Sequence, residues 1–543
     1  MVLHANLIDI HNREIYPSHI TIKDGCINSI KKVKEEASRY MLPGFIDAHV
    51  HIESSMVTPV AFSREAVRHG TIGIISDPHE IANVLGEEGV KFMVENAKRT
   101  PLKILFGAPS CVPATPFESS GANIDAAGIE RMLNIPEVGY LSEMMNYPGV
   151  VQDDPEVMKK LKLARRLGVP VDGHAPGVRG EELKKYAGAG ITTDHECFSY
   201  DEAVDKIGQG MHILIREGSG AKNYKALIPL LKEFPGKVMF CTDDLHPDDL
   251  VQGHINKIVK RTIAEGYDLF DTLRAASLHA QSHYKLEAGL LRVGDPADFI
   301  LVDSPENMDV LATYINGDPV FIDGSVNIPE SATVPVNKFL IGKIEANQIS
   351  VQPEEDQMRI IQAIDGELIT RQMMATPRVE NGNVVSDVEH DILKIVVVNR
   401  YEKAPPAVGF INGFGLKAGA LVSSIGHDSH NIICVGANEK SITESINWVI
   451  QHKGGIAVHD GKIVHGLPLE IAGIMSPESV VYAAGKYKQL SEIAATLGTG
   501  LKAPFMTLAF MALLVIPELK MSDKGLFDGT TFSFTPLFVA GNE

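Results

Sequence analysis

Between residues 42 and 286 the chain repeats a strand, a loop and a helix, and this repeat restricts its fold to a few parallel-sheet architectures. Short apolar segments that predict strands recur eight times: GFIDAHV, TIGIIS, LKILFGA, VGYLSE, VPVDGH, GITTDH, GMHILI and KVMFCTDD. Helical segments such as DPEVMKKLKLARRL separate them. Alternating strands and helices predict a parallel sheet with right-handed crossovers. Eight such units over roughly 240 residues match an α/β chain with a closed (β/α)8 TIM barrel. An open doubly wound sheet is the structural alternative, because the sequence does not give the strand order.

The segments on either side of this repeat have a different pattern. Residues 1–41 and 287–340 alternate apolar and polar residues around short turns such as Lys23-Asp24-Gly25, which is typical of hairpins. We expect these two segments to combine into one small composite β-sandwich domain beside the barrel at residues 42–286. Residues 341–543 mix strand-like and helical segments, with turns at Asn381-Gly382 and Asp460-Gly461. They predict an additional C-terminal α+β domain.

Composition and charge exclude several classes of partner. The formal net charge of −19 argues against a basic surface for nucleic acid. Five scattered cysteines with no CxxC pair argue against a disulfide framework and against a thiolate zinc site. The longest apolar stretch, residues 505–517, is shorter than the ~20 residues needed to span a bilayer. The N-terminal segment lacks the pattern of a secretory signal. We therefore expect a cytoplasmic enzyme with no membrane or nucleic-acid partner.

His49 and His51 form the strongest single motif. They lie two residues apart in FIDAHVH, at the carboxyl end of the first predicted strand. Residues two apart on a strand point to the same side. Both imidazoles should therefore face the barrel mouth, where active sites of this fold form. Because two histidines at this spacing also arise by chance, the motif alone does not establish a metal site.

Four further candidate ligands stand at the ends of other predicted strands. They are Glu143 after the fourth strand, His174 after the fifth, His195 after the sixth and Asp243 after the eighth. Each alone has a structural alternative, such as a helix cap for Asp243 or a loop histidine for His195. The carboxyl ends of all eight strands share one face of a barrel, so we expect these side chains to converge with the histidine pair. Four histidines and two carboxylates suit first-row divalent ions, and the pattern predicts a metal site.

Several segments resemble known hydrolases. PGFIDAHVHIE, DGHAPG, TDHE, CTDD and GDPADFILVD are similar to the amidohydrolase superfamily. Within it, HIESSM, SDPHEIANVLG, SEMMNYPGV and SSIGHDSHNIICVG resemble the adenine deaminases, and the resemblance covers essentially the whole chain. It implies a metal-dependent hydrolase that acts on a C–N bond of the free base adenine, in purine salvage and adenine catabolism.

The resemblance also implies two divalent metal ions, manganese or iron, with zinc as an alternative. The implied ligands are His49, His51 and Asp243 for one ion, His174 and His195 for the other, and Glu143 as the bridge. Many relatives bridge with a carboxylated lysine, which this chain lacks at that strand end. Hydroxide would add to C6 of adenine and ammonia would leave, giving hypoxanthine. A carboxylate must move a proton to the departing amine, so we assign catalytic roles to Asp243, as the proton carrier, and to Glu143.

Weaker candidates for substrate binding lie in the loops around this site. They are Glu53, Ser54, Asp77, His79, Glu80, and, from the C-terminal domain, His427 and His430. Structural roles compete with each: Asp77-Pro78 fits the start of a helix with proline in its first position, and Glu53 and Ser54 fit a helix cap.

Two other functions stay open. One is a different amidohydrolase reaction at the same ions, such as hydrolysis of a cyclic amide or an N-acyl group. The other is a metal-free scaffold, against which the retention of all six candidate ligands speaks. We also expect a homo-oligomer, with a dimer favoured.

Overall fold

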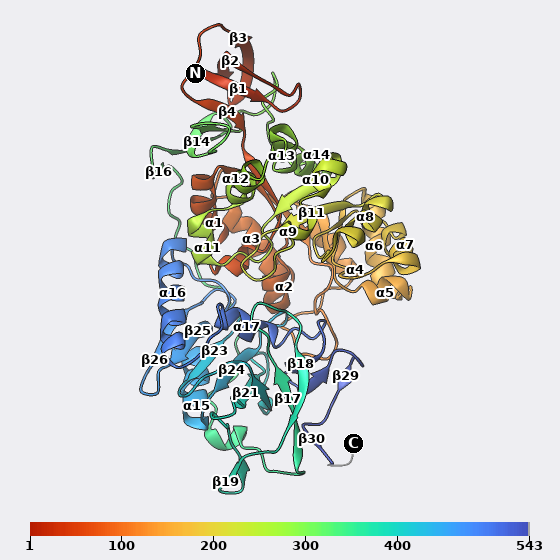
Figure 1. Ribbon diagram of the computed structural model, residues 1–543, viewed down its shortest axis with the longest axis vertical. Helices are drawn as coiled ribbons and strands as arrows, with labels where there is room; N and C mark the ends of the chain where they lie inside the picture. The colour runs from red at the N-terminus through yellow and green to blue at the C-terminus, as the bar shows by residue number, and fades with distance from the viewer. Residues whose placement is uncertain (541–543) are drawn as a thin grey trace. The chain divides into compact units, whose positions relative to one another are not determined.

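The computed structural model describes residues 1–540, which form two compact units (Figure 1). The first unit comprises Met1–His79, Val90–Cys111 and Ile124–Ala332. The second comprises Glu80–Gly89, Val112–Asn123 and the chain from Thr333 on. Two short segments that follow barrel strands thus belong to the second unit. The sequence-based division into three domains places its boundaries elsewhere and stays a prediction.

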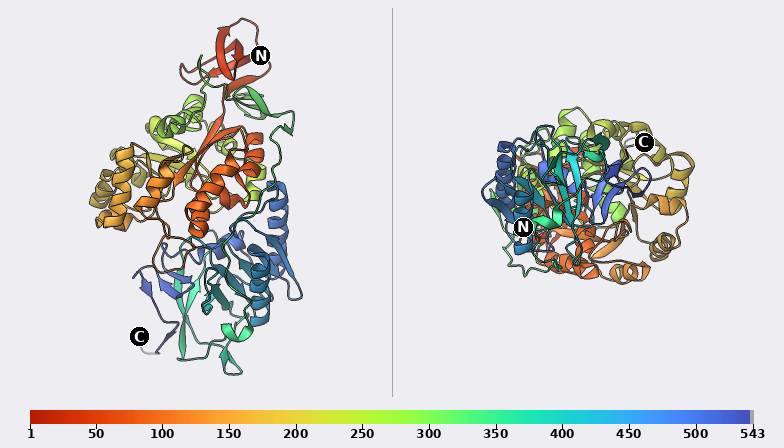
Figure 2. Two further views of the ribbon diagram at one scale, coloured as in Figure 1. Left: turned by 180° about the vertical axis from the view of Figure 1, so that it is seen from behind. Right: turned by 90° about the horizontal axis from the view of Figure 1, so that it is seen from below.

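Eight parallel strands form a closed barrel within the first unit, as the repeat predicted (Figures 1 and 2). Within the described residues its eight strands are β5 (Phe45–Val50), β6 (Thr71–Ser76), β7 (Lys103–Ala108), β8 (Val138–Met144), β9 (Val171–Gly173), β10 (Thr193–Asp194), β11 (His212–Arg216) and β12 (Val238–Cys241). Two junctions close the ring. The Thr192 N–H donates to the Val171 carbonyl at 2.9 Å, and the Asp243 N–H donates to the His49 carbonyl at 2.9 Å. The second bond joins the last strand to the first, which excludes the open doubly wound sheet.

Helices cover the outside of the barrel. The longer ones are α1 (Pro59–Ala66), α3 (Glu87–Ala97), α4 (Ala126–Leu133), α6 (Pro155–Leu167), α7 (Gly180–Gly188), α8 (Tyr200–Gly208) and α12 (Ile255–Ala264). The shorter ones are α5 (Tyr147–Val151), α9 (Tyr224–Leu227), α10 (Leu230–Glu233), α11 (Pro247–Gln252), α13 (Leu269–Ala275) and α14 (Leu278–Tyr284). Helix α2 (His79–Leu85) belongs, except for its first residue, to the second unit.

Helix α6 shows why these segments begin and end where they do. The Asp154 side chain accepts the N–H groups of the first turn, and Pro155 occupies the first helical position. Gly168 ends the helix with φ of 67°, a left-handed conformation that favours glycine. Leu161 and Ala164 on its inner face are buried, so the helix is held by the apolar surface that it buries against the barrel.

The N-terminal segment and residues 299–326 share one sheet in the first unit. Its strand order is β16 (Ser325–Val326), β15 (Asp318–Ile322), β14 (Val310–Ile315), β13 (Phe299–Val302), β4 (Tyr40–Pro43), β1 (Val2–Asp9), β2 (Glu14–Lys23) and β3 (Cys26–Lys32). Strand β4 joins the two segments, because it pairs with β1 on one side and with β13 on the other. Leu7, Ile20 and Phe299 belong to its apolar core.

The second unit is built on a mixed nine-stranded sheet within the described residues. Its strands run in the order β18 (Arg371–Ala375), β17 (Gln357–Gln362), β22 (Ala407–Asn412), β21 (Leu393–Val398), β24 (Ile432–Gly436), β23 (Ala420–Ser423), β25 (Gly455–His459) and β26 (Val464–Pro468), and β30 (Phe538–Val539) pairs with β17. The helices are α15 (Glu439–His452), α16 (Val480–Thr496) and α17 (Pro504–Phe510). Smaller strands are β19 (Val379–Glu380), β20 (Asn383–Val384), β27 (Leu519–Ser522), β28 (Gly525–Asp528) and β29 (Ser533–Phe534).

Sequence features account for the local structure of this unit. Ile442 and Ile446 of α15 pack with Val422 and Cys434 of the sheet in one apolar core. Asn381 and Gly382, both with positive φ, form the predicted tight turn between β19 and β20. The unit therefore mixes helices and strands as the sequence predicted.

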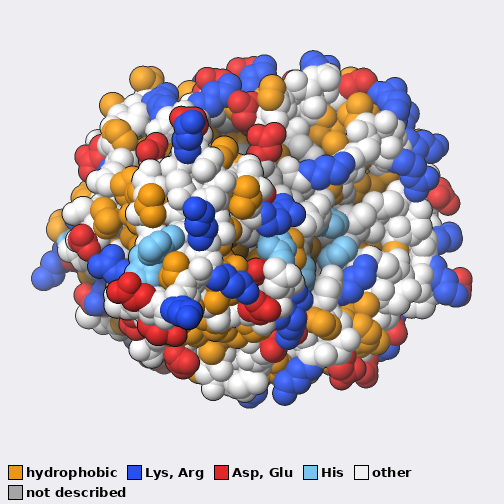
Figure 3. All heavy atoms as spheres, turned by 90° about the horizontal axis from the view of Figure 1, so that it is seen from above, with side chains coloured by type: hydrophobic (Ala, Val, Ile, Leu, Met, Phe, Trp, Pro, Cys, Tyr) orange, Lys and Arg blue, Asp and Glu red, His pale blue; other side chains and the backbone are white. Residues whose placement is uncertain are grey.

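On the face shown in Figure 3, basic and acidic side chains are interspersed, and no broad basic surface covers that face. Over residues 1–540, no helix has both the length and the apolar character required to cross a bilayer.

Candidate metal centre

The barrel brings all six predicted ligands together at the carboxyl ends of its strands. His49 lies in β5 and Glu143 in β8, while His51, His174, His195 and Asp243 follow β5, β9, β10 and β12. Five of the six are buried, and the His174 side chain is 18% exposed. Asp243 adopts a left-handed φ of 57°, which aspartate tolerates better than most residues. This turn carries its carboxylate to the first strand.

Glu143 lies between the two predicted ligand groups, while His49 and His195, one from each group, also stack with ring centroids 4.2 Å apart. Asp243 Oδ1 lies 3.1 Å from His51 Nε2 and 3.6 Å from His49 Nε2. Glu143 Oε1 lies 3.4 Å from His51 Nε2. Its other oxygen, Oε2, lies 2.6 Å from His174 Nδ1 and 3.3 Å from His195 Nε2. The two Glu143 oxygens therefore face the two histidine groups, as a bridging ligand would.

His49 provides the test of whether a metal ion fits. Its side chain is fully buried, and neither ring nitrogen has a hydrogen-bond partner among the described residues. A buried polar group without a partner costs about 1–3 kcal/mol. The nearest carboxylate oxygens, of Asp243 and Asp172, stand 3.6 Å and 4.0 Å away. Imidazole and carboxylate donors suit first-row divalent ions, so the residues present fit a metal ion.

Arg216, at the end of β11, controls the charge of this centre and was missed by the sequence analysis. Its guanidinium is 4% exposed and donates to Asp243 Oδ2 at 2.5 Å and to both oxygens of Glu196. Burial alone would raise the pKa of Asp243, yet Arg216 and the neighbouring histidines hold it well below its usual range. Burial would also raise the pKa of Glu143, and His174 and His195 hold it well below its usual range. Both carboxylates are therefore ionised and able to bind cations.

Two more buried networks support the ligands. Asp47 in β5 accepts the backbone N–H of Thr242 at 3.1 Å and the N–H of His49 at 3.2 Å, and its Oδ2 lies 2.9 Å from His254 Nε2. Asp172 Oδ2 lies 4.0 Å from His49 Nδ1, and Asp172 Oδ1 accepts a hydrogen bond from the Tyr284 hydroxyl at 2.9 Å. Burial raises the pKa of Asp172 to about 7. No sequence motif marks these contacts, because the partners lie far apart along the chain.

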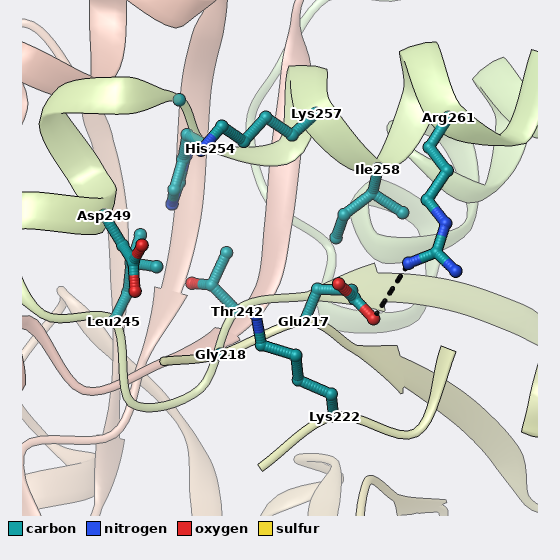
Figure 4. A pocket seen from close by; sticks show the side chains of 11 residues that line it. Glu217, Gly218, Lys222, Thr242, Leu245, Asp249, His254, Lys257, Ile258 and Arg261 are labelled. Carbon is teal, nitrogen blue, oxygen red and sulfur yellow. Dashed lines mark ion pairs between the residues drawn. The ribbon is translucent and has the colours of Figure 1, made fainter. Parts of the chain in front are cut away.

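A pocket of about 280 Å³ opens beside this support, lined by Glu217, Gly218, Lys222, Thr242, Leu245, Asp249, Gly253, His254, Lys257, Ile258 and Arg261 (Figure 4). None of the predicted metal ligands is among these residues. Thr242 and His254 connect it to Asp47 through the contacts above.

The weaker candidates of the first unit lie close to the ligands. Asp77 Oδ2 accepts the Glu143 N–H at 3.3 Å, and His79 Nδ1 lies 3.4 Å from Glu143 Oε1. Ser54 donates to Asp244, the residue after Asp243, at 2.5 Å. Glu53 is buried in the short 3-10 helix after His51. Helix α2 begins at His79, so Pro78 precedes the helix and does not occupy its first position.

The other three weak candidates meet one another in the second unit. Glu80 Oε1 lies 2.8 Å from His427 Nδ1, and Glu80 also contacts His430. Burial opposes ionisation of Glu80, but the two histidines hold its pKa well below its usual range. That these residues reach the substrate stays a prediction.

Comparisons with known proteins decide the family. The profile of the amidohydrolase family matches residues 40–320, and that of the adenine deaminase C-terminal domain matches residues 367–533. A protein named adenine deaminase from Methanosarcina acetivorans is 52% identical over 98% of each chain. The chain belongs to the adenine deaminase family of amidohydrolases. Two further members of this family, from Methanosarcina mazei and Salinibacter ruber, are 50% and 49% identical over 98% of each chain.

Proposed function

We propose that the chain hydrolyses the C6 amino group of the free base adenine to give hypoxanthine and ammonia. The observation that carries this proposal is the 52% identity, over 98% of each chain, to a protein named adenine deaminase. The six convergent ligand side chains support it, because this hydrolysis requires an activated water.

Each ligand group has a proposed role at the reacting centre. His49, His51 and Asp243 would hold one divalent ion, His174 and His195 would hold the second, and Glu143 would bridge them. Bound ions of this kind polarise the atom under attack and generate a nucleophile from water near neutral pH. The ions are proposed to be manganese or iron, with zinc as the alternative.

Asp243 is proposed to carry the proton. An amide anion is too poor a leaving group, so the departing amine must receive a proton from the chain. Arg216 keeps Asp243 ionised and fixes its Oδ2, while Oδ1 faces the histidines. An ionised, oriented carboxylate next to the nucleophile can accept its proton and pass it to the amine.

Ammonia release from a panel of substrates tests the reaction. We expect turnover of adenine and a much lower kcat/KM with adenosine, because the relatives that resemble the whole chain are named for the free base. A cyclic amide and an N-acyl amino acid serve as the competing substrates, and chromatography of their products follows them because their hydrolysis releases no ammonia. Turnover of either one without turnover of adenine would favour the other amidohydrolase reaction.

Reconstitution of apoprotein tests the metal count. Six candidate ligands exceed the three protein ligands of a typical single catalytic zinc. We expect activity to rise until about two equivalents of Mn²⁺ per chain are added, on this ligand arithmetic. Saturation at one equivalent would refute the binuclear centre.

We also propose a cytoplasmic dimer that acts in purine salvage. All five cysteines are free, which agrees with a reducing compartment.

A further inference from the structure

Lys206 is a buried lysine that takes no part in the proposed reaction. It lies in α8 (Figure 1), and its side chain is fully buried. Its Nζ contacts three oxygens: the Ala175 carbonyl at 2.7 Å, Glu202 Oε1 at 2.8 Å and Asp194 Oδ2 at 3.1 Å. An ammonium group has three N–H donors, and each has an acceptor here. A buried polar network in which every donor has an acceptor makes the surrounding structure rigid.

Asp194 binds the chain next to both histidines of the second metal group. Its Oδ2 accepts the N–H of Ala175, the residue after His174, at 3.1 Å. Its Oδ1 accepts the N–H of Glu196, the residue after His195, at 2.8 Å. One carboxylate therefore holds the two ligand loops together.

Glu202 repeats this arrangement a few residues further along each loop. Its Oε1 accepts the Gly177 N–H at 2.9 Å, and its Oε2 accepts the Phe198 N–H at 3.1 Å. Lys206 lies one helical turn after Glu202 and contacts both carboxylates. The carboxylates of Asp194 and Glu202 thus accept four backbone N–H groups, two from each loop. Both carboxylates also contact the Lys206 ammonium.

We propose that Lys206, Asp194 and Glu202, the Lys206 triad, position His174 and His195 and thereby set the affinity of the second metal site. The proposal rests on the proposed binuclear centre. Contacts that orient metal ligands before the ion arrives raise the affinity of the site. The triad fixes that spacing through backbone bonds adjacent to each histidine. Within residues 1–540, no hydrogen bond or ion pair joins the triad to His49, His51 or Asp243, so the first site should be spared.

Lys206→Met is the principal test variant. It removes the shared ammonium but keeps an unbranched apolar side chain. We expect the affinity of the second site for Mn²⁺ to fall by about 10–100-fold, the usual effect of losing a supporting contact behind a metal ligand. The first site should change little. Lys184→Met is the matched control, because Lys184 in the neighbouring α7 is 57% exposed and pairs only with Glu181 among the contacts described.

Metal binding by apoprotein, followed by calorimetry and by metal content after dialysis, gives the readout without any assay of activity. At a free Mn²⁺ concentration between the second-site dissociation constants of wild type and Lys206→Met, wild type and Lys184→Met should retain about two ions per chain and Lys206→Met about one, on the ligand arithmetic above. Amide hydrogen exchange of Ala175, Gly177, Glu196 and Phe198 should accelerate in apo Lys206→Met. A general loss of stability would instead speed exchange throughout the unit.

Glu202→Gln decides the question if Lys206→Met does not fold. A carboxamide accepts through one oxygen only, so either Gly177 or Phe198 loses its acceptor. This variant should also weaken the second site. Wild-type protein that binds a single ion would refute the binuclear centre itself. Two ions in wild type, with unchanged second-site affinity in the folded variants, would overturn the role of the triad alone.

Discussion

Glu118→Gln should stabilise the second unit at alkaline pH and leave it unchanged in acid. Glu118 is 6% exposed. Burial, the nearby Asp428 and, more weakly, Asp523 raise its pKa from 4.5 to about 8. Below pH 4.5 the glutamate is protonated in both the folded and the unfolded chain. Between pH 4.5 and pH 8 the unfolded chain releases the proton and the folded chain keeps it, so the free energy of unfolding falls as pH rises.

The size of the effect follows from the shift. Each pKa unit corresponds to about 1.4 kcal/mol, so the loss approaches 5 kcal/mol by pH 8. Glutamine carries no titratable proton and resembles the neutral acid that the site prefers. Relative to wild type, the variant should therefore gain about 4 kcal/mol between pH 5 and pH 8.

Urea unfolding followed by tryptophan fluorescence measures this difference. The single tryptophan, Trp448, lies in α15, so its signal reports the second unit. Glu470→Gln, at an exposed position of the same unit, is the control and should show no pH-dependent gain. A gain for Glu118→Gln that is equal at pH 5 and pH 8 would refute the reasoning.

Three further perturbations test the barrel. Asp243→Asn should keep at least one bound ion yet lower kcat by about 10² or more, because the amide cannot carry the proton; near-normal turnover with both ions bound would move that role elsewhere. Arg216→Met should lower the free energy of unfolding of the apoprotein by about 3–5 kcal/mol, since it leaves Glu196 and Asp243 buried without their cation; urea unfolding within ~1 kcal/mol of wild type would contradict this. Burial lowers the pKa of His212 from 6.5 to about 4 and that of His283 from 6.5 to about 3, so the folded chain lacks protons that the unfolded chain binds. The stability of the first unit should fall as pH drops below 6.5, and His212→Gln should reduce that fall; identical acid unfolding of variant and wild type would exclude it.

Much of the barrel could be predicted because its signals are local. Each strand segment is a short apolar run, and each ligand stands at or just past a strand end, as His49 and His174 do. Closure of the barrel then follows from the number of units and places these ends on one face. The convergence of the six candidate ligands could therefore be predicted without knowledge of side-chain contacts.

The supporting residues could not be predicted because their partners are distant in sequence. In the sequence, Arg216 is simply the last residue of a predicted strand. Its ion pairs are with Glu196 and Asp243, which follow other strands, so the sequence does not reveal them. Lys206 and Glu202 have the i, i+4 spacing of a surface ion pair, but the structure buries both. Glu80 and His427 were both singled out from sequence, yet only the fold shows that they contact each other.

Two segments of the second unit lie between barrel strands in the sequence, and this affects how the chain can fold during synthesis. Glu80–Gly89 and Val112–Asn123 leave the ribosome long before Thr333 and the strands that follow it. The Gly121 N–H donates to the Asn83 carbonyl within these segments, but the Gly121 carbonyl accepts from Lys338 and the Ser119 N–H donates to Asp523, which are both made much later. Chains generally fold domain by domain during synthesis, whereas here the second unit cannot be completed until nearly the whole chain has emerged. A fragment that stops at residue 332 would carry these two segments without the rest of their unit, so this protein is poorly suited to division into separately expressed halves.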